Sequence, residues 1–172
     1  MFSVGDLVVY SGEGVCRVEQ IGASPVAHAG ETQSYYHLQP LYRTGTVMTP
    51  VETRVLMRCI MTAAEADSFI DALPAVTAAE IPVGNPRLAK DYYHQCVMSY
   101  DCGRIAALIK ALVAKRSAAL ACGKKTSQLD ERYLKRAQEH LYGELAAALA
   151  MARDEMEGYI KARFPSWPEE DA

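Results

Sequence analysis

Lysine and arginine residues gather in one part of this chain. Between positions 87 and 137 there are eleven of them against four acidic residues, a net charge of 11 − 4 = +7. The flanking parts are acidic: residues 1–73 sum to −4 and residues 138–172 to −5. Local charge of this size attracts a polyanion such as nucleic acid even when the whole chain is negative. The alternative is a solvated helix surface, which basic residues on helices usually form. The candidate contacts to a phosphate backbone are Arg87, Lys90, Arg104, Lys115, Arg116, Lys124, Lys125 and Arg132.

Motifs of known enzyme classes are absent from the sequence. It contains no G-x-S-x-G, H-E-x-x-H, P-loop or G-x-G-x-x-G pattern. Residues 11–14, Ser-Gly-Glu-Gly, have the composition of a phosphate-binding loop, but no helix is expected behind them and no Lys-Ser or Lys-Thr pair follows. We therefore predict that the protein is not an enzyme and uses no cofactor.

Five cysteines and four histidines are the potential metal ligands. The cysteines are odd in number and form no C-x-x-C pair, and no histidine lies in a cluster with them. We predict reduced, mostly buried thiols and no metal site. The sequence also has no apolar run near about 18 residues and no secretory leader, which predicts a soluble protein of the cytoplasm.

The first third of the chain has the pattern of a small antiparallel β domain. Its apolar segments are rich in β-branched and aromatic residues, and the glycines between the first two allow the positive φ values of a tight reversal. Pro50 places the fourth strand at an edge or a bulge. The expected strands are 6–10, 15–21, 34–41, 47–51 and 55–60, with the longest loop at 22–33. Five short strands with brief turns predict an SH3- or Tudor-like barrel.

Helix caps and apolar stripes mark the remainder. Thr62 and Glu65 form a capping box, and Asn85 before Pro86 is a favourable N-cap. Between them, residues 74–86 hold three prolines and one charge, which predicts a linker. The expected helices are 62–73, 86–99, 101–122 and one from 127 that ends or bends between 158 and 165. The second half is therefore expected to be a small helical bundle.

The opening segment carries a resemblance to a known family. Residues 2–21, F-x-V-G-D-x-V-V-Y-x-G-x-G-V-x-x-V-E-x-I, resemble the opening of the CarD/CdnL family of bacterial transcription regulators. The same module occurs in transcription-repair coupling factors. Residues 35–38 and 47–51 are similar to later strands of the family in order and approximate spacing. The resemblance covers residues 2–73 and continues more loosely to about 150.

This resemblance implies that the N-terminal module binds the β subunit of RNA polymerase through exposed strand and loop residues. The fourth strand and its preceding turn are the natural candidates, because a sheet edge accepts a partner strand. The family often places an arginine where this sequence has Met48, and Arg43 is the nearby charge. The candidate polymerase contacts are Arg43, Val47, Met48 and Pro50. The alternative is that Val47 and Met48 are ordinary strand residues.

For the helical half, the resemblance implies contacts to promoter DNA at the upstream edge of the melted region. Members that stabilise the open promoter carry a tryptophan just after the asparagine that corresponds to Asn85, and this sequence has Pro86 there. Its one tryptophan, Trp167, lies near the acidic end of the chain. Leu88 and Tyr92 are the neighbouring side chains that could unstack a base step instead.

Together these features predict an α+β protein, with a small N-terminal SH3/Tudor-like antiparallel β-barrel followed by an all-α domain. The expected parts are 1–73, the polymerase-interacting domain with a short trailing helix; a linker, 74–86; a basic helical domain, 87–164; and an acidic tail, 165–172. The predicted function is that of a nucleoid-associated transcription regulator that binds RNA polymerase and contacts promoter DNA non-specifically. The alternatives are a protein–protein adaptor with no DNA role and, ranked last, a barrel that binds a small molecule.

Overall fold

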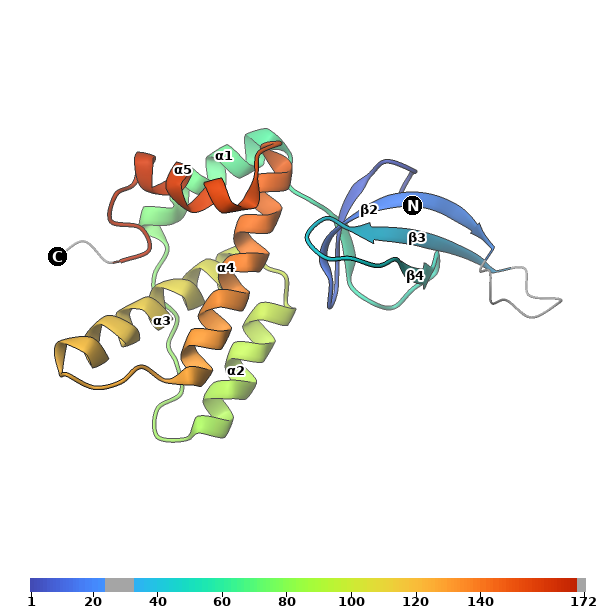
Figure 1. The fold of residues 1–172 in the computed structure, drawn as a ribbon. Helices are drawn as coiled ribbons and strands as arrows, with labels where there is room; N and C mark the ends of the chain where they lie inside the picture. The colour runs from blue at the N-terminus through green and yellow to red at the C-terminus, as the bar shows by residue number, and fades with distance from the viewer. Residues whose placement is uncertain (24–32, 170–172) are drawn as a thin grey trace. The chain divides into compact units, whose positions relative to one another are not determined.

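A computed structural model describes residues 1–23 and 33–169 and divides the chain into two compact units, Met1–Ile60 and Met61–Ala172. The first unit is made of strands and the second of helices (Figure 1). The α+β class expected from the sequence is therefore confirmed. Most of the loop predicted at 22–33 and the last three residues of the predicted tail lie outside the described residues.

The first unit is a five-stranded antiparallel sheet with the strand order β4-β3-β2-β1-β5. This sheet agrees with the Tudor-like β domain expected from the sequence. All five predicted strands form, and β4 lies at an edge, as Pro50 indicated. The strands are β1 (Leu7–Tyr10), β2 (Gly14–Ala23), β3 (Ser34–Pro40), β4 (Val47–Pro50) and β5 (Met57–Cys59).

One face of the sheet carries a small apolar core. Its buried members come from the first three strands: Val8, Cys16, Val18, Tyr36 and Leu38. Phe2 packs edge-on against Tyr36 and its backbone N–H donates to the Tyr36 hydroxyl at 3.0 Å, which closes the N-terminus over this core. Burial raises the pKa of the Cys16 thiol to about 12, so this sulfur stays protonated and acts as an apolar side chain.

Helices form the second unit, and their starts agree with the predicted caps. Thr62 and Glu65 make the reciprocal capping box, Asn85 accepts from two backbone N–H groups, and Asp101 and Ser127 each accept from one. The elements are α1 (Ala63–Ala72), η1 (Leu73–Ala75), α2 (Pro86–Met98), α3 (Cys102–Ala121), α4 (Gln128–Ala148), η2 (Arg153–Glu155) and α5 (Met156–Arg163). No helix within the described residues is both long and apolar enough to cross a bilayer.

The helix α1, expected as the trailing helix of the β domain, belongs to the helical unit. Ala66, Ile70 and Leu73 are fully buried in the core that α2, α3 and α4 share. The carboxylate of Glu144 on α4 accepts from the backbone N–H of Met61 at 3.2 Å, at the first residue of this unit. Burying the apolar stripe of α1 against α4 places the division of the chain between Ile60 and Met61.

The segment expected as a linker, residues 74–86, joins α1 to α2 inside one unit and packs along α3. The Ala79 N–H donates to the Ala107 carbonyl at 3.0 Å. The ammonium of Lys110, a buried side chain of α3, donates to the carbonyls of Pro74 at 3.0 Å and Val76 at 2.8 Å. Lys110, one of the eleven basic residues between positions 87 and 137, therefore stabilises the fold and is not available to bind DNA.

The last predicted helix is wrong in its extent. The sequence pattern continues it to at least 158, whereas α4 ends at Ala148 and the chain reverses through Ala150, whose φ is +54°. The N–H of Ala150 donates to the Ala147 carbonyl and that of Met151 to the Ala146 carbonyl, the two bonds of a Schellman motif. This reversal lets Met156 and Ile160 of α5 enter the helical core.

Replacing Ala150 with glycine is expected to raise the free energy of unfolding of the helical unit by about 1 kcal/mol. An L-residue in the left-handed region pays a steric cost that glycine avoids, and Ala150 is exposed, so no packing is lost. Chemical denaturation followed by circular dichroism measures the change. Ala118, exposed in the last turn of α3, serves as the control, because glycine there is expected to destabilise by a similar amount.

The predicted acidic tail begins with residues that pack. Trp167 is 2% exposed, and its indole N–H donates to the Tyr142 hydroxyl at 3.2 Å. The Lys110 ammonium lies 5.9 Å from the centre of the Trp167 ring, on the other element that this segment covers. Trp167 is thus part of the helical core, and no part of it is available to contact DNA.

Candidate functional site

The edge strand β4 presents backbone groups that can pair with another chain. The Val51 N–H donates to the Ser34 carbonyl, and the register then alternates through Tyr36 opposite Thr49 and Leu38 opposite Val47. In an antiparallel ladder the residues between these pairs turn their backbone groups the other way. The N–H and carbonyl of Met48 therefore point outward from the sheet, whereas Pro50 offers a carbonyl and no N–H. The free backbone groups of this edge could pair with a short strand centred on Met48.

The side chains of β4 divide between the core and the surface. Val47 packs against the sheet core, Thr49 is buried, and Met48 is 38% exposed. Pro50 is half-buried opposite Tyr35. The predicted contacts Val47, Met48 and Pro50 therefore lie on one edge strand, and Met48 is the large apolar side chain that this strand offers to a partner.

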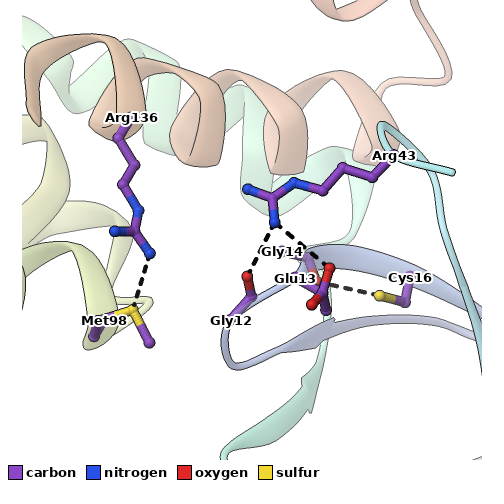
Figure 2. A network of polar contacts seen from close by, with 7 residues as sticks. All are labelled: Gly12, Glu13, Gly14, Cys16, Arg43, Met98 and Arg136. Carbon is purple, nitrogen blue, oxygen red and sulfur yellow. Dashed lines mark hydrogen bonds and ion pairs between the residues drawn. The ribbon is translucent and has the colours of Figure 1, made fainter. Parts of the chain in front are cut away.

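Arg43, the fourth predicted polymerase contact, is held by the β1–β2 turn (Figure 2). Its Nη1 donates to the Gly12 carbonyl at 3.4 Å and lies 3.5 Å from a carboxylate oxygen of Glu13. The turn itself depends on Gly12, at φ +94°, and Gly14, at φ +83°. Arg43 thus braces the hairpin while about half of its side chain stays exposed.

The helices α2, α3 and α4 form an up-down-up bundle (Figure 1). Contacts between them fix the directions: Tyr93 meets Asp130 and Met98 meets Arg136, so α2 and α4 are parallel. Lys115 meets Asp130 and Cys102 meets Glu144, so α3 is antiparallel to α4. As a result, the start of α2, the end of α3 and the start of α4 share one end of the bundle.

All of the predicted DNA-contacting cations except Arg104 lie at this end, which we name the basic end. Its members are Arg87, Lys90, Lys115, Arg116, Lys124, Lys125 and Arg132. Arg104 sits in the first turn of α3, and the eleven residues to Lys115 correspond to about 16 Å of helix axis. The structure therefore groups the lysines and arginines of three elements and leaves Arg104 apart.

Two cations of the basic end are compensated by carboxylates. The Lys115 ammonium lies 2.7 Å from Asp130 and 3.3 Å from the Tyr93 hydroxyl, which itself donates to Asp130 at 3.0 Å. Burial acts to lower the pKa of Lys115, but its bonds to Asp130 and Tyr93 outweigh this and the pKa lies above its ordinary value. Arg116 lies 3.8 Å from Glu131. These pairs reduce what Lys115 and Arg116 can offer a phosphate.

The remaining cations of the basic end are exposed and, among residues 1–23 and 33–169, form no ion pair. They are Arg87, Lys90, Lys124, Lys125 and Arg132. Lys124 and Lys125 follow Gly123, whose φ of +66° closes α3 with a second Schellman motif: Gly123 donates to Leu120 and Lys124 to Ala119. The motif fixes where the chain leaves the helix, so the two lysines are presented from a defined turn.

Arg136, a further basic residue of α4, lies outside this set. Its Nη2 is 3.5 Å from the Met98 sulfur at the end of α2 (Figure 2). Arg132 lies 5.6 Å from the Tyr133 ring, a cation–π contact that leaves its hydrogen-bond donors open. Within the described residues, no three His, Cys, Asp or Glu side chains gather as they would around a metal ion.

Comparison with known proteins decides the nature of the sheet unit. Residues 2–61 match the family model of the CarD-like/TRCF RID domain, where RID denotes the RNA polymerase-interacting domain. Residues 2–61 are therefore a CarD-like/TRCF RID. No curated protein matches it. The match ends within one residue of the sheet unit, so the RID and the first compact unit coincide.

The RID gives this protein a transcription-associated, RNA polymerase-interacting role. The helical unit lies outside the family match, and its N-terminal cap differs from the tryptophan-bearing pattern as the sequence indicated. Pro86 is the first residue of α2, where its missing N–H is harmless. Leu88 is 55% exposed next to it, whereas Tyr92 is half-buried. Of the two substitutes considered for the tryptophan, Leu88 is therefore the more accessible.

Sequence reasoning missed the residues that restrain Lys115. Asp130 carries a visible signal, since it follows the N-cap Ser127 by three positions and its N–H donates to the Ser127 hydroxyl. Tyr93 carries none, because it lies on another helix and its role depends on how α2 and α4 pack. Together, these two buried residues bind the ammonium of Lys115, whose side chain stays about half exposed.

Proposed function

We propose that this RID protein regulates transcription initiation by holding the RNA polymerase β subunit with its sheet unit and promoter DNA with its helical unit. Catalysis has no part in this proposal. Its setting is the bacterial cytoplasm, at the nucleoid. The observation that carries the proposal is the combination of a RID with a second compact unit, whose basic end has five cations that form no ion pair within residues 1–23 and 33–169.

The β4 edge supports the polymerase contact. A partner strand of the β subunit that pairs with Met48 gains backbone hydrogen bonds, and the Met48 side chain adds an adaptable apolar contact. Pro50 limits the length of the pairing because it has no N–H, which also protects the edge from pairing with other copies of the chain. The proposed contact is therefore short and specific in register.

The unpaired cations support contact with the DNA backbone near the upstream edge of the melted region. Long lysine and arginine side chains reach phosphates without reading bases, so binding is non-specific in sequence. The two contacts lie on one chain, and polymerase binding raises the local concentration of the helical unit near the promoter. Modest affinity of each contact is then sufficient.

Salt dependence tests the DNA contact. If the five cations of the basic end that form no ion pair within the described residues each neutralise a phosphate, the logarithm of the binding constant for duplex DNA is expected to fall against log salt with a slope of about −4.5. Fluorescence anisotropy with the full chain and a labelled duplex measures it. A slope near zero, or no binding at low salt, would remove the DNA role and favour the protein–protein adaptor.

A further inference from the structure

The helical unit contains an apolar groove that the proposed function does not use. It lies between the segment 78–86, α3 and the start of α4, and has a volume of about 720 Å³. Small-molecule sites fall in roughly the 300–1,000 Å³ range. Most of the lining is apolar, and Ala79, Val83, Ala114 and Leu129 come from each of its sides. Val83, an apolar residue of the lining, is 96% exposed to solvent.

The side-chain oxygens of Asn85, Ser127 and Asp130, which line the groove, already accept hydrogen bonds. The Asn85 side-chain oxygen accepts from the N–H groups of Arg87 and Leu88, and the Ser127 hydroxyl accepts from Asp130. Asp130 accepts from both Lys115 and Tyr93. Among the side-chain donors of these residues, three have no partner within the described residues and are exposed at the rim of the groove: the Asn85 amide N–H₂, the Ser127 O–H and the third hydrogen of the Lys115 ammonium.

The electrostatic potential at this edge of the groove also favours a negatively charged ligand group. Asn85 and Ser127 are the N-caps of α2 and α4, so two helix N-termini, each with partial positive charge, border the groove. The ion pair with Lys115 balances the Asp130 carboxylate. An apolar surface bordered by donors and positive helix ends is complementary to an apolar molecule with an acceptor of negative charge.

We propose that this groove binds a small apolar carboxylate, such as a medium-chain fatty acid. The alkyl chain of the ligand lies against Ala79, Val83 and Leu129, and its carboxylate accepts hydrogen bonds from Asn85, Ser127 and Lys115. This site is distinct from the proposed phosphate contacts of Lys124 and Lys125. The proposal does not depend on whether the protein binds DNA or polymerase.

Three ligands with the same ten-carbon chain and different head groups test whether the groove prefers a negative charge. Decanoate, below its micelle concentration, is expected to bind the full-length protein with one saturable site in calorimetry and to shift backbone amide signals of residues 79–83 and 127–130. Decan-1-ol is expected to bind at least about tenfold more weakly, because a charge-assisted hydrogen bond is lost. Decyltrimethylammonium is expected to show no saturable binding.

Two alanines on α3 give a matched pair of variants. Ala114 lines the groove, whereas Ala118 is exposed one turn later and lies outside the lining. Ala114→Phe is expected to weaken decanoate binding at least about tenfold by filling the groove, and Ala118→Phe to leave it unchanged. Val83→Asp, at an exposed position, is a second blocking variant that keeps the fold and adds a repelling charge. Equal binding of decanoate and decanol, equal affinity of the two phenylalanine variants, or unsaturable binding would overturn the proposal.

Discussion

Replacing Lys124, Lys125 and Arg132 together with alanine is expected to weaken binding to duplex DNA about 100-fold at about 0.1 M salt. Each is exposed at the basic end and unpaired within the described residues, so each loss removes one phosphate contact and its counterion release. The slope of log affinity against log salt is expected to become about 3 units shallower. Anisotropy titrations across a range of salt concentrations measure both quantities.

The control for this variant is Arg104→Ala. Arg104 carries the same charge on the same helical unit but lies toward the opposite end of α3, so its loss is expected to change DNA affinity little. Polymerase binding is expected to be unchanged in both variants, because the RID lies in the other unit. Equal effects of the triple variant and Arg104→Ala on DNA affinity would show that the basic end is not the DNA contact.

Substituting Met48 with proline is expected to weaken binding to RNA polymerase by about 30-fold. The Met48 N–H points outward from β4, so proline removes a donor from the free edge and leaves the β3–β4 ladder intact. Losing the pairing of this residue with a partner strand is expected to cost about 2 kcal/mol. Biolayer interferometry with core polymerase, and with the isolated β subunit, measures the loss and identifies the subunit.

Met48→Ala separates backbone pairing from side-chain contact. Alanine keeps the N–H and removes the exposed thioether side chain, so its expected effect is smaller, about threefold. Near- and far-ultraviolet circular dichroism spectra of both variants are expected to match the parent, since the Met48 side chain is outside the core. Full polymerase affinity in the proline variant would exclude strand pairing at β4 and direct attention to the loops of the RID.

Local sequence signals were sufficient for most of the fold. The Gly-rich turn after Tyr10, the proline in β4 and the four helix N-caps are each fixed by chemistry within a few residues, and each forms where the sequence predicts it. The apolar stripe of α3, from Ile105 to Val113, is buried as its spacing requires. The RID match confirms the resemblance carried by the opening hairpin.

Features that depend on packing between segments distant in the sequence could not be predicted from local sequence signals. Residues 148–152, Ala-Leu-Ala-Met-Ala, contain no helix breaker, and the reversal at Ala150 arises because α5 buries Met156 and Ile160. The placement of α1 follows from the match of its stripe to α4. In the candidate site, the sequence identified the cations, but which of them bond to other parts of the fold, as Lys110 and Lys115 do, follows from partners on other elements.

The burial of Trp167 has a practical consequence for studying the two units. It is the one tryptophan of the chain, and it lies in the helical core with its indole N–H bonded to Tyr142. Its emission therefore reports the packing of the helical unit, while the sheet unit contributes tyrosine alone. Selective excitation of tryptophan during denaturation follows one unit, and the far-ultraviolet signal follows both. Comparing Trp167 fluorescence with the far-ultraviolet signal therefore distinguishes independent from concerted unfolding of the RID and the helical unit.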